Sequence, residues 1–202
     1  MSQEKNIVLD VGAHLGRYTI ISSNRVGDEG KVVAIEASPL VFEKLKRNIN
    51  LNKLSNTTTM NYAVYSKKTE IKLYFPSEGF KNIVYNSVMS NRSQDIGKFV
   101  NVDANTLDNI TRSIDIQEEE VNWIKIDVEG AELEVLKGSH NILSKSKDIA
   151  ILIEIHDTDG DKNLYREIMN LLNHYHFKKE FEKVYEHGER HVIVRKKIPL
   201  YS

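Results

Sequence analysis

The chain has 202 residues, with 28 lysine and arginine residues against 29 aspartate and glutamate residues and a formal net charge of −1. This length predicts a single domain over residues 1–202, large enough to bury a core without covalent crosslinks. The balanced charge gives no general attraction to nucleic acid, so a nucleic-acid substrate is not expected. Cysteine is absent, which excludes disulfides, thiolate metal ligands and a cysteine nucleophile.

The sequence gives no sign of a membrane segment. No apolar run approaches the roughly 20 residues that a spanning helix needs. Residues 2–6 are polar and lack the apolar core of a signal peptide. We therefore expect a cytoplasmic protein.

The first motif is NIVLDVGAHLGRYT at residues 6–19. An apolar run ends at Asp10, Gly12 and Gly16 follow, and a helix is expected directly afterwards. A strand, a glycine-bearing turn and a helix are how α/β proteins hold nucleotide-like cofactors. His14 stands where a dinucleotide-binding turn has its second glycine, so the spacing disfavours NAD. It resembles the cofactor loop of S-adenosylmethionine-dependent methyltransferases instead.

The remaining elements alternate along the chain. Helices are predicted at 18–25, 39–52, 106–116, after Gly130 and at 164–175. Strands are predicted at 31–36, 57–65, 121–127 and 149–156, followed by an antiparallel pair at 177–185 and 191–195. Near-continuous apolar strands are typical of a parallel sheet covered on both faces. The alternation predicts a doubly wound α/β fold.

Residues 66–121 interrupt this alternation. Strands are expected at 71–75 and 99–102, with a polar stretch rich in asparagine and glycine between them. We interpret the region as a β insertion with a mobile loop between the third and fourth strands. Such a loop is a natural place for residues that determine substrate specificity. The acidic run Glu118–Glu120 is expected to be solvated.

Glu36 ends the second predicted strand, 20 residues after Gly16. In nucleotide-binding α/β folds an acidic residue at this separation accepts hydrogen bonds from the ribose hydroxyls. A carboxylate that is merely exposed at a strand end is the alternative. The coincidence of the glycine loop with Glu36 favours the ribose role.

A second signature, KIDVEGAELEVLKGS, occupies residues 125–139. Four further blocks stand in order around it: DVGAHLGRYT at 10–19, VVAIEASP at 32–39, VDANTLD at 102–108 and ILIEIH at 151–156. With these motifs the chain resembles the FkbM-type family of S-adenosylmethionine-dependent methyltransferases. The resemblance implies a Rossmann-like, seven-stranded, mostly parallel sheet with helices on both faces. It also implies S-adenosylmethionine as the cofactor and, usually, methyl transfer to a hydroxyl oxygen of a small molecule or sugar.

The predicted cofactor contacts lie on the loops at the ends of the strands: Asp10, Gly12, Ala13, His14, Gly16, Tyr18, Thr19, Glu36, Ala37, Ser38, Ala63, Val64 and Asp127. The chain departs from the family's common pattern in two respects. His14 replaces the usual asparagine, and the sequence begins almost directly at the first strand, so we expect an N-terminal cap that could shape the acceptor pocket to be missing.

Methyl transfer to oxygen needs a group that accepts the hydroxyl proton. The candidates are Asp127, Glu129 and His156. Asp127 and His156 end the fourth and fifth predicted strands at the same carboxyl edge, where ligands bind in open α/β sheets. A neutral imidazole suits base work near pH 7, although a structural histidine is the alternative. A metal site built from Asp127, His156 and Asp157 is conceivable, but no ligand spacing demands one, so no metal is predicted.

Lys125 and Glu154 are charged residues within apolar strands. An unpaired buried charge costs several kcal/mol, so these two are expected to pair with each other or with Asp10 or Asp127, unless they serve the site directly. The histidines at 174, 176, 187 and 191 are expected to be surface or packing residues. Two further functions stay open: an NAD-dependent oxidoreductase, and a cofactor-binding module without turnover. A homo-oligomer is possible.

Overall fold

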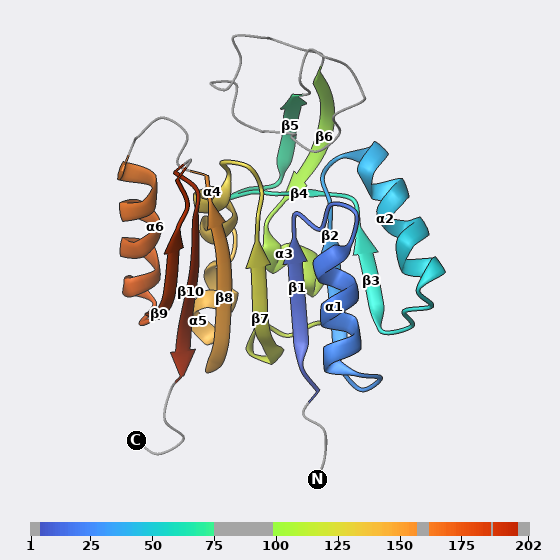
Figure 1. Cartoon of the computed structure of the whole chain (residues 1–202), viewed down its shortest axis with the longest axis horizontal. Helices are drawn as coiled ribbons and strands as arrows, with labels where there is room; N and C mark the ends of the chain where they lie inside the picture. Colours follow the sequence, from blue (N-terminus) through green and yellow to red (C-terminus); the bar gives the residue numbers. More distant parts are fainter. Residues whose placement is uncertain (1–4, 75–98, 157–161, 187, 198–202) are drawn as a thin grey trace.

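The computed structural model describes residues 5–74, 99–156, 162–186 and 188–197. Its centre is a seven-stranded sheet in the order β3-β2-β1-β7-β8-β10-β9 (Figure 1). Five neighbouring strands run parallel, in the order β3, β2, β1, β7 and β8, and β10 is antiparallel to β8 and β9. Their bounds are β1 (Ile7–Val11), β2 (Lys31–Ile35), β3 (Thr57–Met60), β7 (Val121–Ile126), β8 (Asp148–Ile155), β9 (Lys178–Val184) and β10 (Arg190–Lys197).

Helices cover both faces of this sheet, which confirms the predicted fold class. Figure 1 shows α1 (Arg17–Val26) in front of the sheet and α3 (Leu107–Arg112) and α5 (His140–Lys145) behind it. The other helices are α2 (Pro39–Leu51), α4 (Glu132–Lys137) and α6 (Lys162–His174). The main hydrophobic core joins the central strands to α3, α4, α5 and α6, and a smaller core lies beneath α1 and α2.

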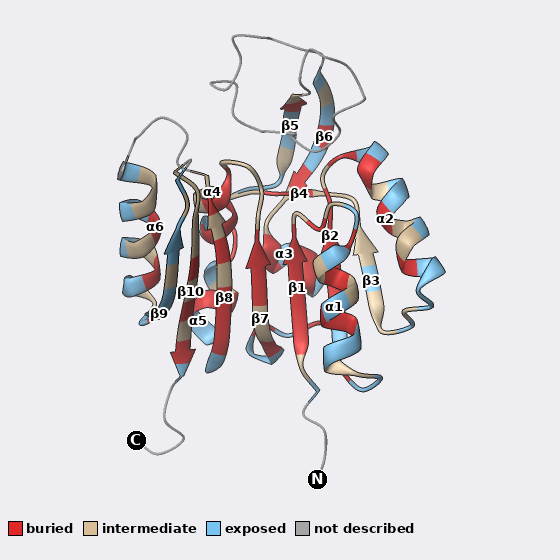
Figure 2. Cartoon of the chain, viewed as in Figure 1, coloured by how far each residue is buried: buried red, intermediate tan, exposed pale blue. Residues whose placement is uncertain are grey.

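The central strands are apolar because they are covered on both sides. All five residues of β1 are buried, and most of β7 and β8 are buried as well (Figure 2). Complete burial of a leucine or isoleucine side chain contributes roughly 1.5–3 kcal/mol, so these strands hold the sheet in place. Their carboxyl ends meet at one edge, from which the loops carrying the predicted site residues leave.

The predicted strand 57–65 is two strands, and this prediction was wrong in its extent. β3 ends at Met60, and the side-chain amide of Asn61 donates hydrogen bonds to the backbone oxygens of Glu36 (2.7 Å) and Ala37 (3.1 Å). The chain then leaves the main sheet, and β4 (Ala63–Val64) pairs with β6 in a second sheet. Asn61 therefore ties the end of β3 to the loop after β2.

The second sheet confirms the predicted β insertion. Its order is β4-β6-β5, with β5 (Thr69–Tyr74) antiparallel to β6 (Phe99–Asn105). Figure 1 shows this pair above the carboxyl edge of the main sheet. The polar stretch predicted as a mobile loop lies at 75–98, outside the described residues.

Two other local predictions need correction. The helix predicted after Gly130 is two helices, α4 and α5, separated at Gly138 and Ser139. A Cβ at Gly138 would lie 2.1 Å from the backbone oxygen of Tyr65, so the close approach requires glycine. In the acidic run, which forms the 3-10 helix η3 (Glu118–Glu120), Glu118 is not solvated.

Glu118 is buried between two cationic side chains. Its carboxylate pairs with Arg112 at 2.9 Å and with Lys145 at 3.2 Å. These contacts join α3 and α5, which the sequence alone does not bring together. Among the described residues, no helix is long and apolar enough to cross a bilayer.

Candidate functional site

The loop after β1 crosses the end of β7 at very short range. Gly12 and Gly16 both have positive φ, 77° and 87°, a region that favours glycine. A Cβ at Gly12 would lie 1.8 Å from the backbone oxygen of Asp127. The N–H groups of Gly12 and Ala13 donate to the backbone oxygen of Ile35, each at 3.0 Å. The glycine loop is thereby fixed between the ends of β2 and β7.

Glu36 lies against this loop. Its Oε2 accepts a hydrogen bond from the backbone N–H of His14 at 2.9 Å, and its Oε1 accepts one from the backbone N–H of Ser38 at 2.8 Å. Burial raises the pKa of the Glu36 carboxyl, and the two backbone hydrogen bonds oppose that rise. Each carboxylate oxygen can accept more than one hydrogen bond, so Glu36 keeps capacity for ligand hydroxyls.

A cavity of about 200 Å³ opens beside Glu36. Eight of the predicted site residues line it: Gly12, His14, Glu36, Ala37, Ala63, Val64, Asp127 and Glu129. Tyr62, Leu73, Val128 and Ala131 also line it, and sequence reasoning did not single them out. Glycine, a fixed carboxylate and apolar walls suit a nucleoside-like ligand, so the residues present fit the predicted cofactor.

Other predicted contacts lie behind the cavity or away from it. Asp10 is buried and accepts a hydrogen bond from the Thr19 hydroxyl at 2.5 Å. Ala13 and Ser38 are buried too, and a Cβ at Gly16 would meet Leu45 rather than the cavity. Tyr18 lines a separate cavity together with Trp123.

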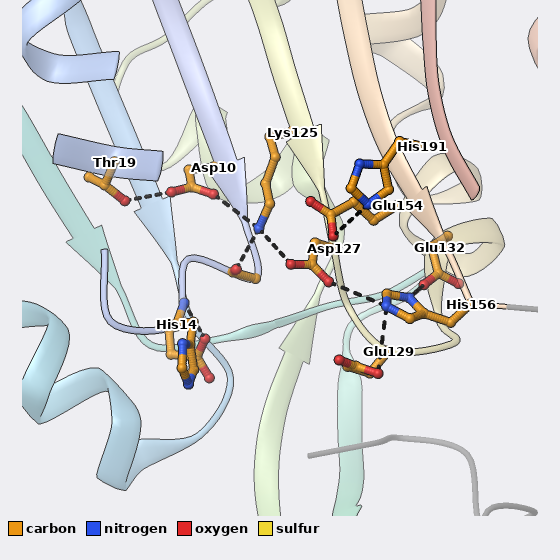
Figure 3. Close-up of polar contacts among 12 residues, drawn as sticks. Asp10, His14, Thr19, Lys125, Asp127, Glu129, Glu132, Glu154, His156 and His191 are labelled. Atoms are coloured by element: carbon orange, nitrogen blue, oxygen red, sulfur yellow. Dashed lines mark hydrogen bonds and ion pairs between the residues drawn. The ribbon is translucent and has the colours of Figure 1, made fainter. Parts of the chain in front are cut away.

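Lys125 connects the glycine loop to Asp127. Its Nζ donates to the backbone oxygen of Gly12 at 2.8 Å and lies 3.2 Å from Asp127 Oδ2 and 3.6 Å from Asp10 Oδ1 (Figure 3). Burial lowers the pKa of the Lys125 ammonium, but the charges of Asp10 and Asp127 outweigh burial and raise it. The predicted pairing of Lys125 with these aspartates is confirmed.

His156 follows β8 and lies among three carboxylates. Its Nδ1 is 2.9 Å from Glu132 Oε1, and its Nε2 is 3.8 Å from Asp127 Oδ1 and 3.7 Å from Glu129 Oε2 (Figure 3). Burial disfavours the charged ring, but Glu132 and the other two carboxylates raise the pKa of His156 to about 9. The imidazole is therefore protonated at neutral pH, whereas a neutral base was expected.

Glu132 is a candidate site residue that the sequence analysis did not single out. It is fully buried, and its Oε1 also accepts the backbone N–H of Gly130 at 2.9 Å. It belongs to the KIDVEGAE block, but from the sequence alone it is predicted to be an ordinary acidic residue in the first turn of a helix. Only the fold shows that it faces His156 from a different element.

Glu154 finds a partner that the sequence did not indicate. The antiparallel register of β8 and β10 sets His191 opposite Glu154, and His191 Nε2 lies 3.4 Å from Glu154 Oε2. Glu189 Oε1 is 2.6 Å from the same nitrogen. His191 was expected to be a surface or packing residue, yet it is half-buried and hydrogen-bonded to a carboxylate. Asp157 and His187 lie outside the described residues.

Known methyltransferases are similar to this chain in sequence. Residues 10–179 match the family model described as the methyltransferase FkbM domain. The methyltransferase sdnD of Sordaria araneosa is 29% identical over 154 residues, covering 65% of this chain and 59% of that protein. The hexuronic acid methyltransferase AglP of Haloferax volcanii is 26% identical over 157 residues, covering 77% of this chain and 58% of that protein.

A solved structure shows the same fold. The methyltransferase FkbM from Methylobacillus flagellatus KT superposes with a TM-score of 0.64 at 16% sequence identity, covering 96% of this chain and 44% of that one. The chain spans a little under three fifths of the length of the two relatives named above. The match over residues 10–179 confirms the methyltransferase family that the motifs predict. The cofactor of that family is the predicted one, S-adenosylmethionine. The chain belongs to the FkbM family of methyltransferases.

Proposed function

We propose that this chain transfers a methyl group from S-adenosylmethionine to a hydroxyl oxygen of a small molecule or sugar. The observation that supports this most directly is the cavity that Glu36 and Gly12 share with Asp127 and Glu129. One cavity thus carries a carboxylate suited to ribose hydroxyls and carboxylates suited to an acceptor proton. The hexuronic acid methyltransferase among the relatives supports a sugar as the acceptor class.

In this proposal Glu36 accepts hydrogen bonds from the two ribose hydroxyls. Its orientation is fixed in advance by the N–H groups of His14 and Ser38, so little ordering is required when the cofactor binds. Gly12 allows the backbone to approach the cofactor without a side chain. Ala37, Ala63 and Val64 supply small or apolar surface around the same cavity.

The cofactor supplies an electrophilic methyl group: the acceptor oxygen bonds to the methyl carbon, the carbon–sulfur bond breaks toward sulfur, and the hydroxyl proton leaves. Glu129 is the carboxylate we assign to that proton. It lines the cavity and lies 3.7 Å from His156 Nε2. Asp127 holds the ammonium of Lys125 at 3.2 Å, and we assign it that positioning role. When no cation is bound to it, His156 is protonated at neutral pH and stabilises the negative charge of both carboxylates instead of accepting a proton itself.

The test is a methyl-transfer assay with labelled S-adenosylmethionine and a panel of hydroxyl compounds that includes hexuronic acid sugars. We expect a methyl ether, identified by NMR, from at least one acceptor. Glu129→Gln should lose turnover while retaining cofactor binding, and the exposed Glu119→Gln serves as the matched control. A methyl ester or an N-methyl product would contradict hydroxyl methylation. Cofactor binding without turnover on the whole panel would favour a binding module.

A further inference from the structure

Three potential metal ligands meet at the carboxyl edge of the sheet. Asp127 follows β7 and His156 follows β8, and these two strands are parallel neighbours. Glu129 lies two residues beyond Asp127 on the same loop. One donor atom from each of the three lies within 4.8 Å of the other two. Figure 3 shows the carboxylates of Asp127 and Glu129 converging on one side of the imidazole.

The separations are too long for direct hydrogen bonds and leave room for an ion between the three side chains. His156 Nε2 is 3.8 Å from Asp127 Oδ1 and 3.7 Å from Glu129 Oε2, both beyond hydrogen-bond length. In the octahedral shell of an Mn²⁺-type ion, two neighbouring ligand bonds of about 2.1–2.2 Å meet at roughly 90° and set their donor atoms about 3.0–3.1 Å apart. A small movement of these side chains therefore brings all three donors onto one cation.

Glu132 gives an independent indication of a cation. This carboxylate is fully buried, and its Oε1 holds His156 Nδ1 at 2.9 Å. A carboxylate on one ring nitrogen, with the other nitrogen directed at further donors, is the arrangement that orients metal-binding histidines. Glu132 Oε2 is also buried and has no hydrogen-bond partner among the described residues. A buried carboxylate in that state is stabilised by positive charge on the group it holds, which is the His156 ring or an ion bound to that ring.

The local charge balance points the same way. Asp127, Glu129 and Glu132 carry three negative charges around His156. The lysine closest to them, Lys125, divides its charge between Asp127 and the buried Asp10. A divalent cation bound at His156 Nε2 would take the place of the proton on that nitrogen and offset more of this negative charge than the proton does.

We propose that Asp127, Glu129 and His156 bind a divalent cation of the Mn²⁺ type, with Glu132 as a positioning residue. Two carboxylates and one imidazole favour Mn²⁺ over Mg²⁺, which prefers an all-oxygen shell. Asp127 and Glu129 also line the cavity described above, so the cation can hold acceptor oxygens beside it. That role rests on the proposed function, whereas cation binding itself does not.

The experiment is a titration of metal-stripped, cofactor-free protein with Mn²⁺. Binding is measured by calorimetry and by the electron paramagnetic resonance signal of free Mn²⁺. We expect one ion per chain. His156→Gln should weaken binding more than tenfold, and Glu132→Gln should weaken it by about 10–100-fold through loss of orientation. The exposed His174→Gln is the matched control and should bind as the unaltered protein does. Circular dichroism confirms that each variant is folded.

Saturable binding that His156→Gln and Asp127→Asn leave unchanged would overturn the proposal, as would the absence of saturable binding at millimolar Mn²⁺. Tighter binding of Mg²⁺ than of Mn²⁺ would contradict the imidazole ligand. S-adenosylhomocysteine is titrated into the same samples. If the protein binds S-adenosylhomocysteine but not Mn²⁺, only the cation site is rejected. If it binds Mn²⁺ but not S-adenosylhomocysteine, only the proposed function is rejected.

Discussion

The Glu36 carboxylate and the backbone N–H of His14 form a 2.9 Å hydrogen bond between the end of β2 and the glycine loop after β1. The bond joins the two segments whose motifs first indicated a nucleotide-like cofactor. The second oxygen of Glu36 accepts the N–H of Ser38 at the start of α2, so three segments converge on one carboxylate. Glu36 therefore shapes the site as well as offering hydrogen bonds to a ligand.

Glu36→Gln should weaken binding of S-adenosylhomocysteine by roughly 10–100-fold. The amide keeps the size of the side chain but replaces one acceptor oxygen with a donor, and a hydrogen bond to a charged group contributes about 1.5–3 kcal/mol. Calorimetry measures the change. Glu43→Gln on the exposed side of α2 is the control and should have no effect. Equal affinity in both variants would remove Glu36 from the cofactor site.

Gly12→Ala should be more damaging than Gly16→Ala, although both glycines have positive φ. The added Cβ at position 12 meets the rigid backbone oxygen of Asp127 at 1.8 Å, whereas at position 16 it meets the movable Leu45 Cδ1 at 2.7 Å. The shared cost of the left-handed conformation is about 1–2 kcal/mol. Urea unfolding and S-adenosylhomocysteine affinity measure the difference. A milder effect at position 12 would contradict the close approach.

Lys125→Met should destabilise the fold by about 3–5 kcal/mol, because it leaves Asp10 and Asp127 without their buried cation. Removing one of these charges in the double variant Lys125→Met, Asp10→Asn should restore part of the loss. Denaturant unfolding measures both variants. A cost below about 1 kcal/mol for the single substitution would mean that the cluster contributes little to stability.

The ion pairs of His156 should make stability depend on pH. Burial opposes protonation, but Glu132, Glu129 and Asp127 raise the pKa of His156 from 6.5 to about 9. A raised pKa in the folded state stabilises the protein fully below pH 6.5, and this contribution is lost as the pH rises through about 9. In EDTA, the stability lost in His156→Gln should therefore be larger at pH 6 than above pH 9. A loss that grows with pH would contradict the assignment.

Periodicity and motif spacing predicted the order of the main elements because they depend on local sequence. The strand at 57–65 was predicted too long because apolar residues continue past Met60. In the structure, Asn61 ends the strand through a hydrogen bond to the backbone of Glu36, which lies far from it in sequence. The break between α4 and α5 likewise depends on the backbone of Tyr65, which lies far from Gly138 in sequence. Local patterns carry no information about such contacts.

The site residues also divide into those that local sequence predicts and those that depend on distant contacts. Glu36, Gly12 and Asp127 could be predicted because each stands at a strand end in a recognisable motif. The Glu154–His191 pair depends on the register between β8 and β10, and the Glu132–His156 contact depends on the packing of α4 against β8. Neither pair has a signal in sequence spacing. The charge of His156 also follows from its three-dimensional neighbours and not from its position at a strand end.

Calorimetric titration of the purified chain with S-adenosylhomocysteine and, separately, with NAD tests the central claim most directly. A folded protein that binds a ligand at 100 times the dissociation constant gains about 2.7 kcal/mol, so a thermal-shift measurement should agree with the titration. We predict saturable binding of S-adenosylhomocysteine with one site per chain and no binding of NAD. Binding of NAD alone, or of neither ligand by the folded chain, would contradict the account.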